Sequence, residues 1–111
     1  MSVTLLRRAD YRRMRWKNGL GWTTEILRQP DDDAFDLRLS VAAAESNAPF
    51  SPFAGVDRSL LLLEGNGMEL RIADAPPQLL NTRGQLVRFA GETPVEARLL
   101  DGPTRDFNVM T

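Results

Sequence analysis

The feature that most constrains the fold is a series of short apolar or alternating segments separated by turns rich in glycine and proline. The run Phe-Asp-Leu-Arg-Leu-Ser-Val at 35–41 alternates apolar and polar side chains, which is typical of a strand with one buried face. Similar segments occupy residues 3–6, 22–28, 59–63, 68–72, 85–89, 95–100 and 107–110. Turn signals recur about every 8–12 residues, and this spacing predicts an all-β fold, an antiparallel sandwich or small barrel.

The connections refine this prediction. Residues 59–63 and 68–72 flank Glu64-Gly65-Asn66-Gly67, so we expect them to form a β-hairpin. Two prolines predict a loop over 47–55, because proline cannot donate to a central ladder. Helix signals are few. Asp10 can cap a helical turn over 11–14, and 79–82 is a second candidate, so we expect at most one or two short helical turns.

Length and charge exclude several classes of protein. With 111 residues the chain is expected to form a single domain over 1–111. Its 14 basic and 15 acidic side chains are interspersed, which argues against nucleic acid or an anionic membrane as a partner. No apolar run approaches the roughly 20 residues of a membrane span, and the first residues lack a signal-peptide pattern. We therefore expect a cytoplasmic protein.

The sequence contains no histidine and no cysteine. Zinc, copper and non-haem iron sites depend on those ligands, and a Ser-His-Asp or Cys-His arrangement is equally impossible. The acidic run Asp31-Asp32-Asp33 follows Gln29-Pro30, and we interpret it as an exposed turn rather than a magnesium or calcium site. We expect neither a metal nor a cofactor.

Residues 15–25 are the strongest candidate for a binding loop. This stretch holds Trp16, Lys17, Asn18 and Trp22, with Gly19 and Gly21 between them. Glycine allows close backbone approach to a ligand, tryptophan supplies a flat surface with a polar handle, and lysine and asparagine supply donors. The alternative is a buried turn in which both tryptophans are core anchors.

Other candidates lie on the predicted strands. Arg38 and Ser40 share the polar face of segment 35–41, and they point either to solvent or into the mouth of a cavity. Asp57 and Arg58 precede the apolar run 60–63; they either form a structural pair that braces the loop, or Arg58 grips a ligand carboxylate. Asn108 is either a donor that faces a cavity or an edge residue.

Several blocks of sequence carry a resemblance to a known family. Tyr-Arg-Arg-Met at 11–14 precedes Trp-Lys-Asn-Gly at 16–19, and further blocks follow at 35–42, 49–58, 62–65, 89–92 and 99–111. In this order, and over essentially the whole chain, they resemble the HutD/Ves family of cupin-like proteins. The chain departs from the family pattern at Leu20, where the family loop has glycine, and at Arg15, where proline is common.

The resemblance implies a cupin-like jelly roll that binds a small molecule. Family members are associated with histidine utilisation and connected with binding of N-formylglutamate in a regulatory role. They are also longer, with a second cupin-like half, so the chain resembles the N-terminal half of a two-barrel protein. The implied ligand is a small acidic metabolite, and the candidate contacts are Trp16, Lys17, Asn18, Arg38, Ser40, Asp57, Arg58 and Asn108.

Two other classes stay open at this point. The chain would be an enzyme of small acids acting without metal, an isomerase or lyase, if Lys17 or Glu25 served as general base with a strongly shifted pKa. It would be an interaction domain if an exposed sheet edge paired with another copy. A barrel without its companion half should expose apolar surface or an unpaired edge, so we expect self-association, most simply as a dimer.

Overall fold

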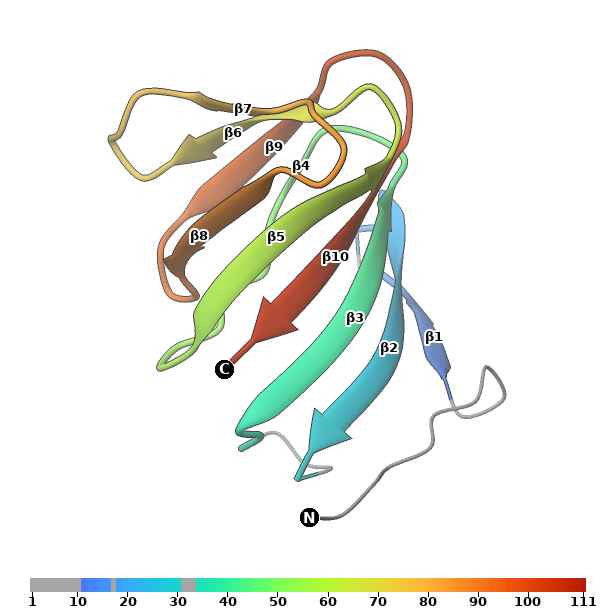
Figure 1. Ribbon diagram of the computed structural model, residues 1–111, viewed down its shortest axis with the longest axis vertical. Helices are drawn as coiled ribbons and strands as arrows, with labels where there is room; N and C mark the ends of the chain where they lie inside the picture. Colours follow the sequence, from blue (N-terminus) through green and yellow to red (C-terminus); the bar gives the residue numbers. More distant parts are fainter. Residues whose placement is uncertain (1–10, 17, 31–33) are drawn as a thin grey trace.

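The computed structural model describes residues 11–16, 18–30 and 34–111 and shows a β-sandwich, drawn in Figure 1. Its six-stranded sheet has the order β1-β2-β3-β10-β5-β8, its four-stranded sheet the order β4-β9-β6-β7, and the paired strands are antiparallel. The strands of the described residues are β1 (Arg12–Arg15), β2 (Gly21–Gln29), β3 (Leu37–Ala44), β4 (Ala48–Pro49), β5 (Asp57–Glu64), β6 (Met68–Ile72), β7 (Gln78–Leu80), β8 (Leu86–Ala90), β9 (Val95–Leu99) and β10 (Thr104–Met110).

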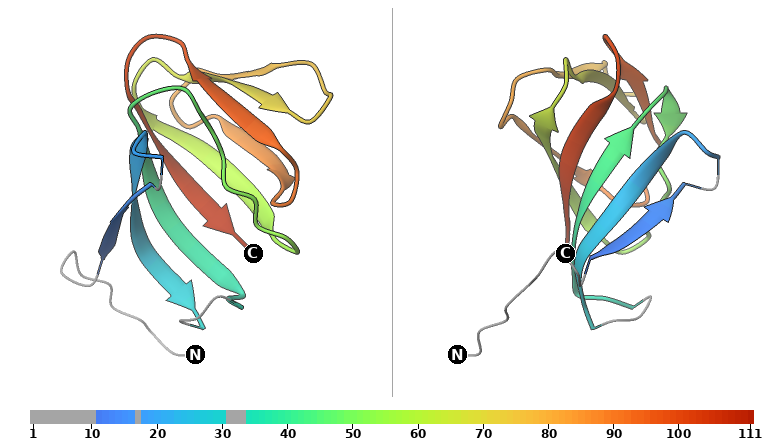
Figure 2. Two further views of the ribbon diagram at one scale, coloured as in Figure 1. Left: turned by 180° about the vertical axis from the view of Figure 1, so that it is seen from behind. Right: turned by 90° about the vertical axis from the view of Figure 1, so that its right-hand side faces the viewer.

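The apolar core lies at one end of the sandwich. It is formed by inward side chains of β5 and β8 on one sheet and of β6, β7 and β9 on the other. The fully or nearly fully buried members are Leu60, Leu62, Met68, Leu70, Leu80, Val87, Val95 and Ala97. Figures 1 and 2 show that the small sheet lies toward the β5–β8 end of the large sheet, away from β1 and β2.

The remaining inner face of the large sheet is polar. β10 lies in the middle of this sheet, and its inward residues Thr104, Asp106 and Asn108 are buried. Buried Ser40 lies beside Asn108 on β3, and buried Glu25 beside Ser40 on β2. The period-two pattern of each strand thus places polar side chains side by side within the fold.

The all-β, antiparallel prediction is confirmed, but the two predicted helical turns are wrong, and the predicted loop over 47–55 includes the two-residue strand β4, which proline can join because β4 is a sheet edge. Residues 11–14 form no helical turn: β1 pairs with β2, and Arg13 and Arg15 of β1 stack on Trp22 at 4.3 and 4.9 Å from the ring centroid. Residues 79–82 are not helical either, because β7 includes Leu79 and Leu80 and pairs with β6. The predicted strand at 3–6 lies outside the described residues.

The predicted hairpin of 59–63 with 68–72 is also wrong. β5 pairs with β10 and β8, whereas β6 pairs with β9 and β7, so the turn through Gly65 and Gly67 carries the chain from one sheet to the other. The reason is burial. The leucines of β5 and the methionine and leucine of β6 pack against each other in one core between the two sheets, and strands that are neighbours in a single sheet could not face each other in this way.

In the part of the chain that is described, no helix is long and apolar enough to cross a membrane.

Candidate ligand-binding site

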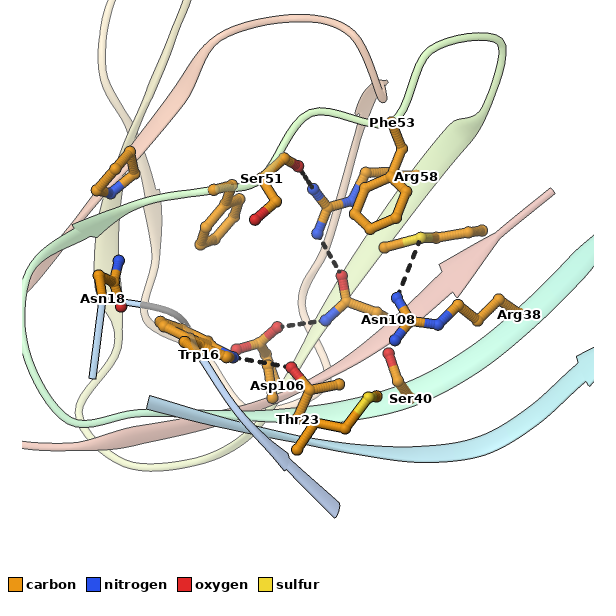
Figure 3. A pocket seen from close by; sticks show the side chains of 15 residues that line it. Trp16, Asn18, Thr23, Arg38, Ser40, Ser51, Phe53, Arg58, Asp106 and Asn108 are labelled. Carbon is orange, nitrogen blue, oxygen red and sulfur yellow. Dashed lines mark hydrogen bonds between the residues drawn. The ribbon is translucent and has the colours of Figure 1, made fainter. Parts of the chain in front are cut away.

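A cavity of about 400 Å³ opens between the polar inner face of the large sheet and the loop after β4 (Figure 3). Strands β1, β2, β3, β5 and β10 and the 49–53 segment all contribute to its wall. The residues that line it are Met14, Trp16, Asn18, Thr23, Arg38, Ser40, Ala42, Pro49, Phe50, Ser51, Phe53, Arg58, Asp106, Asn108 and Met110.

Strand register explains why residues distant in sequence meet here. Arg38, Met110 and Arg58 form one cross-strand row over β3, β10 and β5. Ser40 lies opposite Asn108 in the next row, and Ala42 opposite Asp106 in the one after that. Since alternate residues share a face, the three rows present two guanidinium groups, a hydroxyl, an amide and a carboxyl to one space.

Arg58 is the buried cation of this site. Its Nη2 donates to Asn108 Oδ1 at 2.9 Å and its Nη1 donates to the carbonyl oxygen of Ser51 at 3.2 Å, while its Nε has no partner within the described residues. Three phenylalanine rings surround the guanidinium, those of Phe50, Phe53 and Phe89, with centroids 5.2–5.5 Å away.

No carboxylate of the described chain lies within ion-pair distance of this guanidinium. Burial lowers the pKa of Arg58 to about 10, with the negative field of Asp106 opposing the shift and nearby Arg38 adding to it. Arg58 therefore stays cationic at neutral pH. A buried guanidinium held by neutral groups and aromatic faces is suited to binding an anion.

Asp106 is the buried carboxyl group of the same cavity. Asn108 Nδ2 donates to its Oδ2 at 2.9 Å, so the amide of Asn108 links Asp106 to Arg58. Burial raises the pKa of Asp106 to about 7, and the hydrogen bond from Asn108 and the charge of Arg58 only partly offset this. Near neutral pH both the protonated and the ionised form of this group are therefore populated.

Arg38, by contrast, has a counter-ion. Its Nε donates to Glu25 Oε1 at 2.8 Å, and Glu25 also lies 3.6 Å from Arg28 and 3.8 Å from Arg12. An irregularity in the β2–β3 register between Glu25 and Leu27 turns Glu25 and Arg28 to the same face. Glu25 is not among the residues that line the cavity, so its position does not favour the general-base hypothesis.

From the 15–25 segment, Trp16, Asn18 and Thr23 line the cavity. Trp16 Nε1 donates to Thr23 Oγ1 at 2.8 Å, and a Cβ at Gly21 would lie 2.8 Å from the Trp16 ring, so glycine is needed for this close approach. Asn18 Oδ1 accepts a hydrogen bond from the backbone N–H of Leu20 at 3.0 Å. Trp22 points to the opposite face, between Arg13 and Arg15, and is not a core anchor.

The structure thus brings together most of the residues selected from the sequence. Six of them line the cavity: Trp16, Asn18, Arg38, Ser40, Arg58 and Asn108. Asp57 does not; it is exposed at the start of β5, where its backbone exchanges two hydrogen bonds with Thr111. Lys17 lies outside the described residues.

Sequence reasoning missed Asp106 and the phenylalanines around Arg58. The sequence did contain a pattern that could have indicated Asp106, because alternation places it on one strand face with Thr104, Asn108 and Met110. That face is largely polar, however, and resembles a solvent-exposed one. The phenylalanines at 50 and 53 were visible only as apolar residues in a proline-containing loop.

The cavity does not suit a metal ion of the kind that histidine-rich barrels hold. Its described lining offers one carboxyl group beside two guanidinium groups, a donor set that repels cations. Within residues 11–16, 18–30 and 34–111 there is no group of three or more carboxylates placed to hold an ion. The guanidinium groups of this cavity are therefore suited to binding an anion.

With this geometry established, comparison with known proteins places the chain. A family model described as HutD matches residues 8–111. The chain belongs to the HutD family. It is 44% identical over 111 residues to the "Uncharacterized 21.2 kDa protein in hutC 3'region" of Pseudomonas putida, a match that covers 98% of this chain and 58% of that protein. It is 42% identical over 97 residues to "Protein Ves" of Cronobacter sakazakii, covering 86% of this chain and 53% of that protein.

Solved structures agree with this assignment. HutD from Pseudomonas fluorescens SBW25 matches this HutD-family chain with a TM-score of 0.87 at 39% identity, over 95% of this chain and 58% of that one. The chain thus spans between 53% and 58% of the length of these relatives. A Cupin_2 domain of an XRE family transcriptional regulator from Enterobacter cloacae has a TM-score of 0.66 at 21% identity, over 82% of this chain and 95% of that one. The fold is therefore cupin-like.

Proposed function

We propose that this HutD-family chain binds a small carboxylate metabolite and serves as a sensor in the regulation of histidine utilisation, with N-formylglutamate as the candidate ligand. The observation that carries the proposal is Arg58. It is a buried guanidinium that faces a cavity, has an unpartnered Nε and makes no ion pair with a described carboxylate. Such a group gains most from an anionic partner, because a desolvated charge without a counter-ion is costly.

The rest of the cavity supports a ligand of this kind. A volume of about 400 Å³ suits a small metabolite. Arg38 adds a second cation on the same wall, and Ser40 and Asn108 offer polar contacts in the neighbouring cross-strand row. Phe53 lies within reach of both Arg38 and Arg58, at 5.7 and 5.5 Å from its ring centroid, and gives the site an apolar side.

Family membership supports the biological setting. The Pseudomonas putida relative is named for its place in the hutC 3' region, and another relative of known structure carries the name HutD. Among the described residues, the cavity lining offers two guanidinium groups to an acidic ligand, which supports a role in sensing an acidic intermediate.

The proposal is tested by measuring binding of N-formylglutamate, urocanate, glutamate and histidine. Trp16 lines the cavity and Trp22 lies on the opposite face, so the variant Trp22→Phe leaves one tryptophan as a reporter. We expect a saturable change in its fluorescence with one acid, and a rise in unfolding temperature that corresponds to about 2.7 kcal/mol at 100 times the Kd.

The matched variants are Arg58→Gln and Arg88→Gln. Arg88 is exposed on β8 and lies beside Ser59, off the cavity wall, so its loss should leave the Kd unchanged. Arg58→Gln should weaken binding at least tenfold, and Arg58→Lys, which keeps the charge but loses the planar fork, should give an intermediate loss. If both glutamine variants bind equally well, or if the parent binds none of the four acids, the proposal is wrong.

One observation favours a second candidate, an enzyme of small acids that works without metal. Asp106 is a buried carboxyl group with a pKa of about 7 on the cavity wall, and such a group can act as general acid or base. Incubation of the same acids in D₂O, followed by NMR, tests this. Enzyme-dependent deuterium incorporation or product formation that Asp106→Asn abolishes would favour the enzyme; unchanged spectra would reject it.

A further inference from the structure

Asp106 also bears on how the ligand is held, and this inference rests on the proposed function. We propose that Asp106 binds the ligand as a neutral carboxylic acid whose Oδ1–H donates a hydrogen bond to a ligand carboxylate, so that binding takes up a proton from solution. Asp106 is then a ligand-binding and specificity-determining residue, and the acid binds together with its proton.

The hydrogen-bond chain fixes where that proton must sit. A guanidinium can only donate, so the group of Asn108 that meets Arg58 Nη2 at 2.9 Å is its carbonyl oxygen. The amide nitrogen of Asn108 is thereby turned toward Asp106 and donates to Oδ2, also at 2.9 Å. Oδ2 is an acceptor in this arrangement, which leaves Oδ1 as the oxygen that carries the proton of the neutral acid.

Oδ1 is free to meet a ligand. The described residues give it no hydrogen-bond partner, although the Asp106 side chain is about 2% exposed. Figure 3 shows the Asp106 carboxyl group at the cavity wall, on the side of Asn108 away from Arg58. Arg58 and Asp106 line the same cavity and are linked through Asn108, so a ligand with two polar ends can meet both residues.

The charges around Asp106 decide which protonation state accepts such a ligand. Among the described residues, β5 supplies Arg58, β3 supplies Arg38, and β2 supplies Glu25, which pairs with Arg38 and also with Arg28 and Arg12. Where β1 lines the cavity it contributes Met14, which is uncharged. An arriving carboxylate adds negative charge beside a desolvated carboxyl group, and this favours the protonated form further.

Burial has already brought the pKa of Asp106 to about 7, so protonation at neutral pH costs little. Proton linkage gives the direction in which the Kd changes with pH and the pH range of that change. Below about pH 7 the empty site holds the proton and the Kd is constant; above it the proton must be taken up on binding, and the Kd rises about tenfold per pH unit.

The experiment is calorimetric titration of N-formylglutamate between about pH 6 and about pH 8.5, in buffers of different ionisation enthalpy. We expect the parent to take up close to a full proton per ligand at the upper end of that range. Asp106→Asn keeps an amide N–H where the acid proton was, so it should bind with a pH-independent Kd and no proton uptake. Asp106→Leu, which has no donor, should bind weakly at every pH.

The control is Asp74→Asn, an exposed aspartate in the loop after β6, which should behave like the parent. Tight binding by the parent without proton uptake, or a parent and an Asp106→Asn variant with parallel pH profiles, overturns the role of Asp106 and leaves the binding function intact. No binding by the parent at any of these pH values overturns the proposed function, and this inference with it.

Discussion

The buried carboxyl group of Asp106 makes the stability of this fold depend on pH. Its pKa rises from the ordinary 3.8 to about 7 because of burial, so between these values the native carboxyl group holds a proton that the unfolded chain has released. Unfolding then releases a proton, and the free energy of unfolding falls as the pH rises. The contribution is fully present below about pH 4 and lost above about pH 7, with a maximal slope of about 1.4 kcal/mol per pH unit.

This prediction is checked by urea unfolding across that range. Asp106→Asn removes the titration, so its free energy of unfolding should fall less steeply with pH than that of the parent, and Asp74→Asn should follow the parent. Parallel curves for the parent and Asp106→Asn would show that the carboxyl group does not titrate in this window.

At the same scale, the sequence could predict which residues carry useful donors but not which of them share a cavity. Arg38 and Arg58 were visible as donors beside apolar runs, and both line the site. Asp106 was not, because alternation assigns a residue to a face without saying whether that face is buried. Its burial follows from the position of β10 between β3 and β5, a long-range pairing that no local pattern specifies.

At the scale of elements, most strand positions could be read from the period-two pattern, whereas strand partners could not. The segment 68–72 coincides with β6, and segments 22–28 and 95–100 match β2 and β9 closely. The hairpin prediction failed because a short glycine-containing turn is compatible with pairing in one sheet or with passage between two. Only the common burial of Leu60, Leu62 and Met68 in one core decides between them.

The loop between β4 and β5 is held in place by Gly91, and this gives a second prediction. The N–H of Phe53 donates to the carbonyl of Gly91 at 2.8 Å, and the N–H of Gly91 donates to the carbonyl of Val56 at 2.6 Å. A Cβ at Gly91 would collide with the carbonyl of Phe53. Gly91→Ala should therefore displace the loop that carries Ser51 and Phe53 over the cavity, lower the free energy of unfolding by roughly 1–3 kcal/mol and weaken ligand binding.

The control for this loop is Gly102→Ala. Gly102 has a φ of +79°, and a Cβ added there would meet no described atom within 4 Å, so alanine adds local backbone strain without touching the site. Denaturant unfolding and titration with the ligand distinguish the two variants. Gly102→Ala should lose stability but keep the Kd of the parent, and an unchanged Kd in Gly91→Ala would contradict the positioning role of the loop.

At the scale of the whole molecule, the sandwich divides its interior into two parts. Aliphatic side chains fill the end where the two sheets face each other, whereas the buried polar and charged side chains of the large sheet gather at the cavity on the other end. The separation allows a buried cation and a buried carboxyl group to be retained, because the apolar core supplies the burial that stabilises the fold. The proposed anion site therefore lies beside the apolar core and not within it.

Self-association stays a prediction, and the structure indicates where to test it. Leu79 on β7 and Leu86 on β8 are about half exposed, and Gln85 joins their segments by donating its Nε2–H to the carbonyl of Leu79 at 2.8 Å. Both strands are sheet edges in the described chain, and exposed apolar edges favour pairing between copies.

Sedimentation velocity at about 100 μM should show a dimer for the parent. The double variant Leu79→Ser/Leu86→Ser should shift toward monomer, whereas Leu100→Ser, at an exposed leucine elsewhere, should not. A monomeric parent would reject self-association, and a dimer that survives the double variant would place the interface on another face.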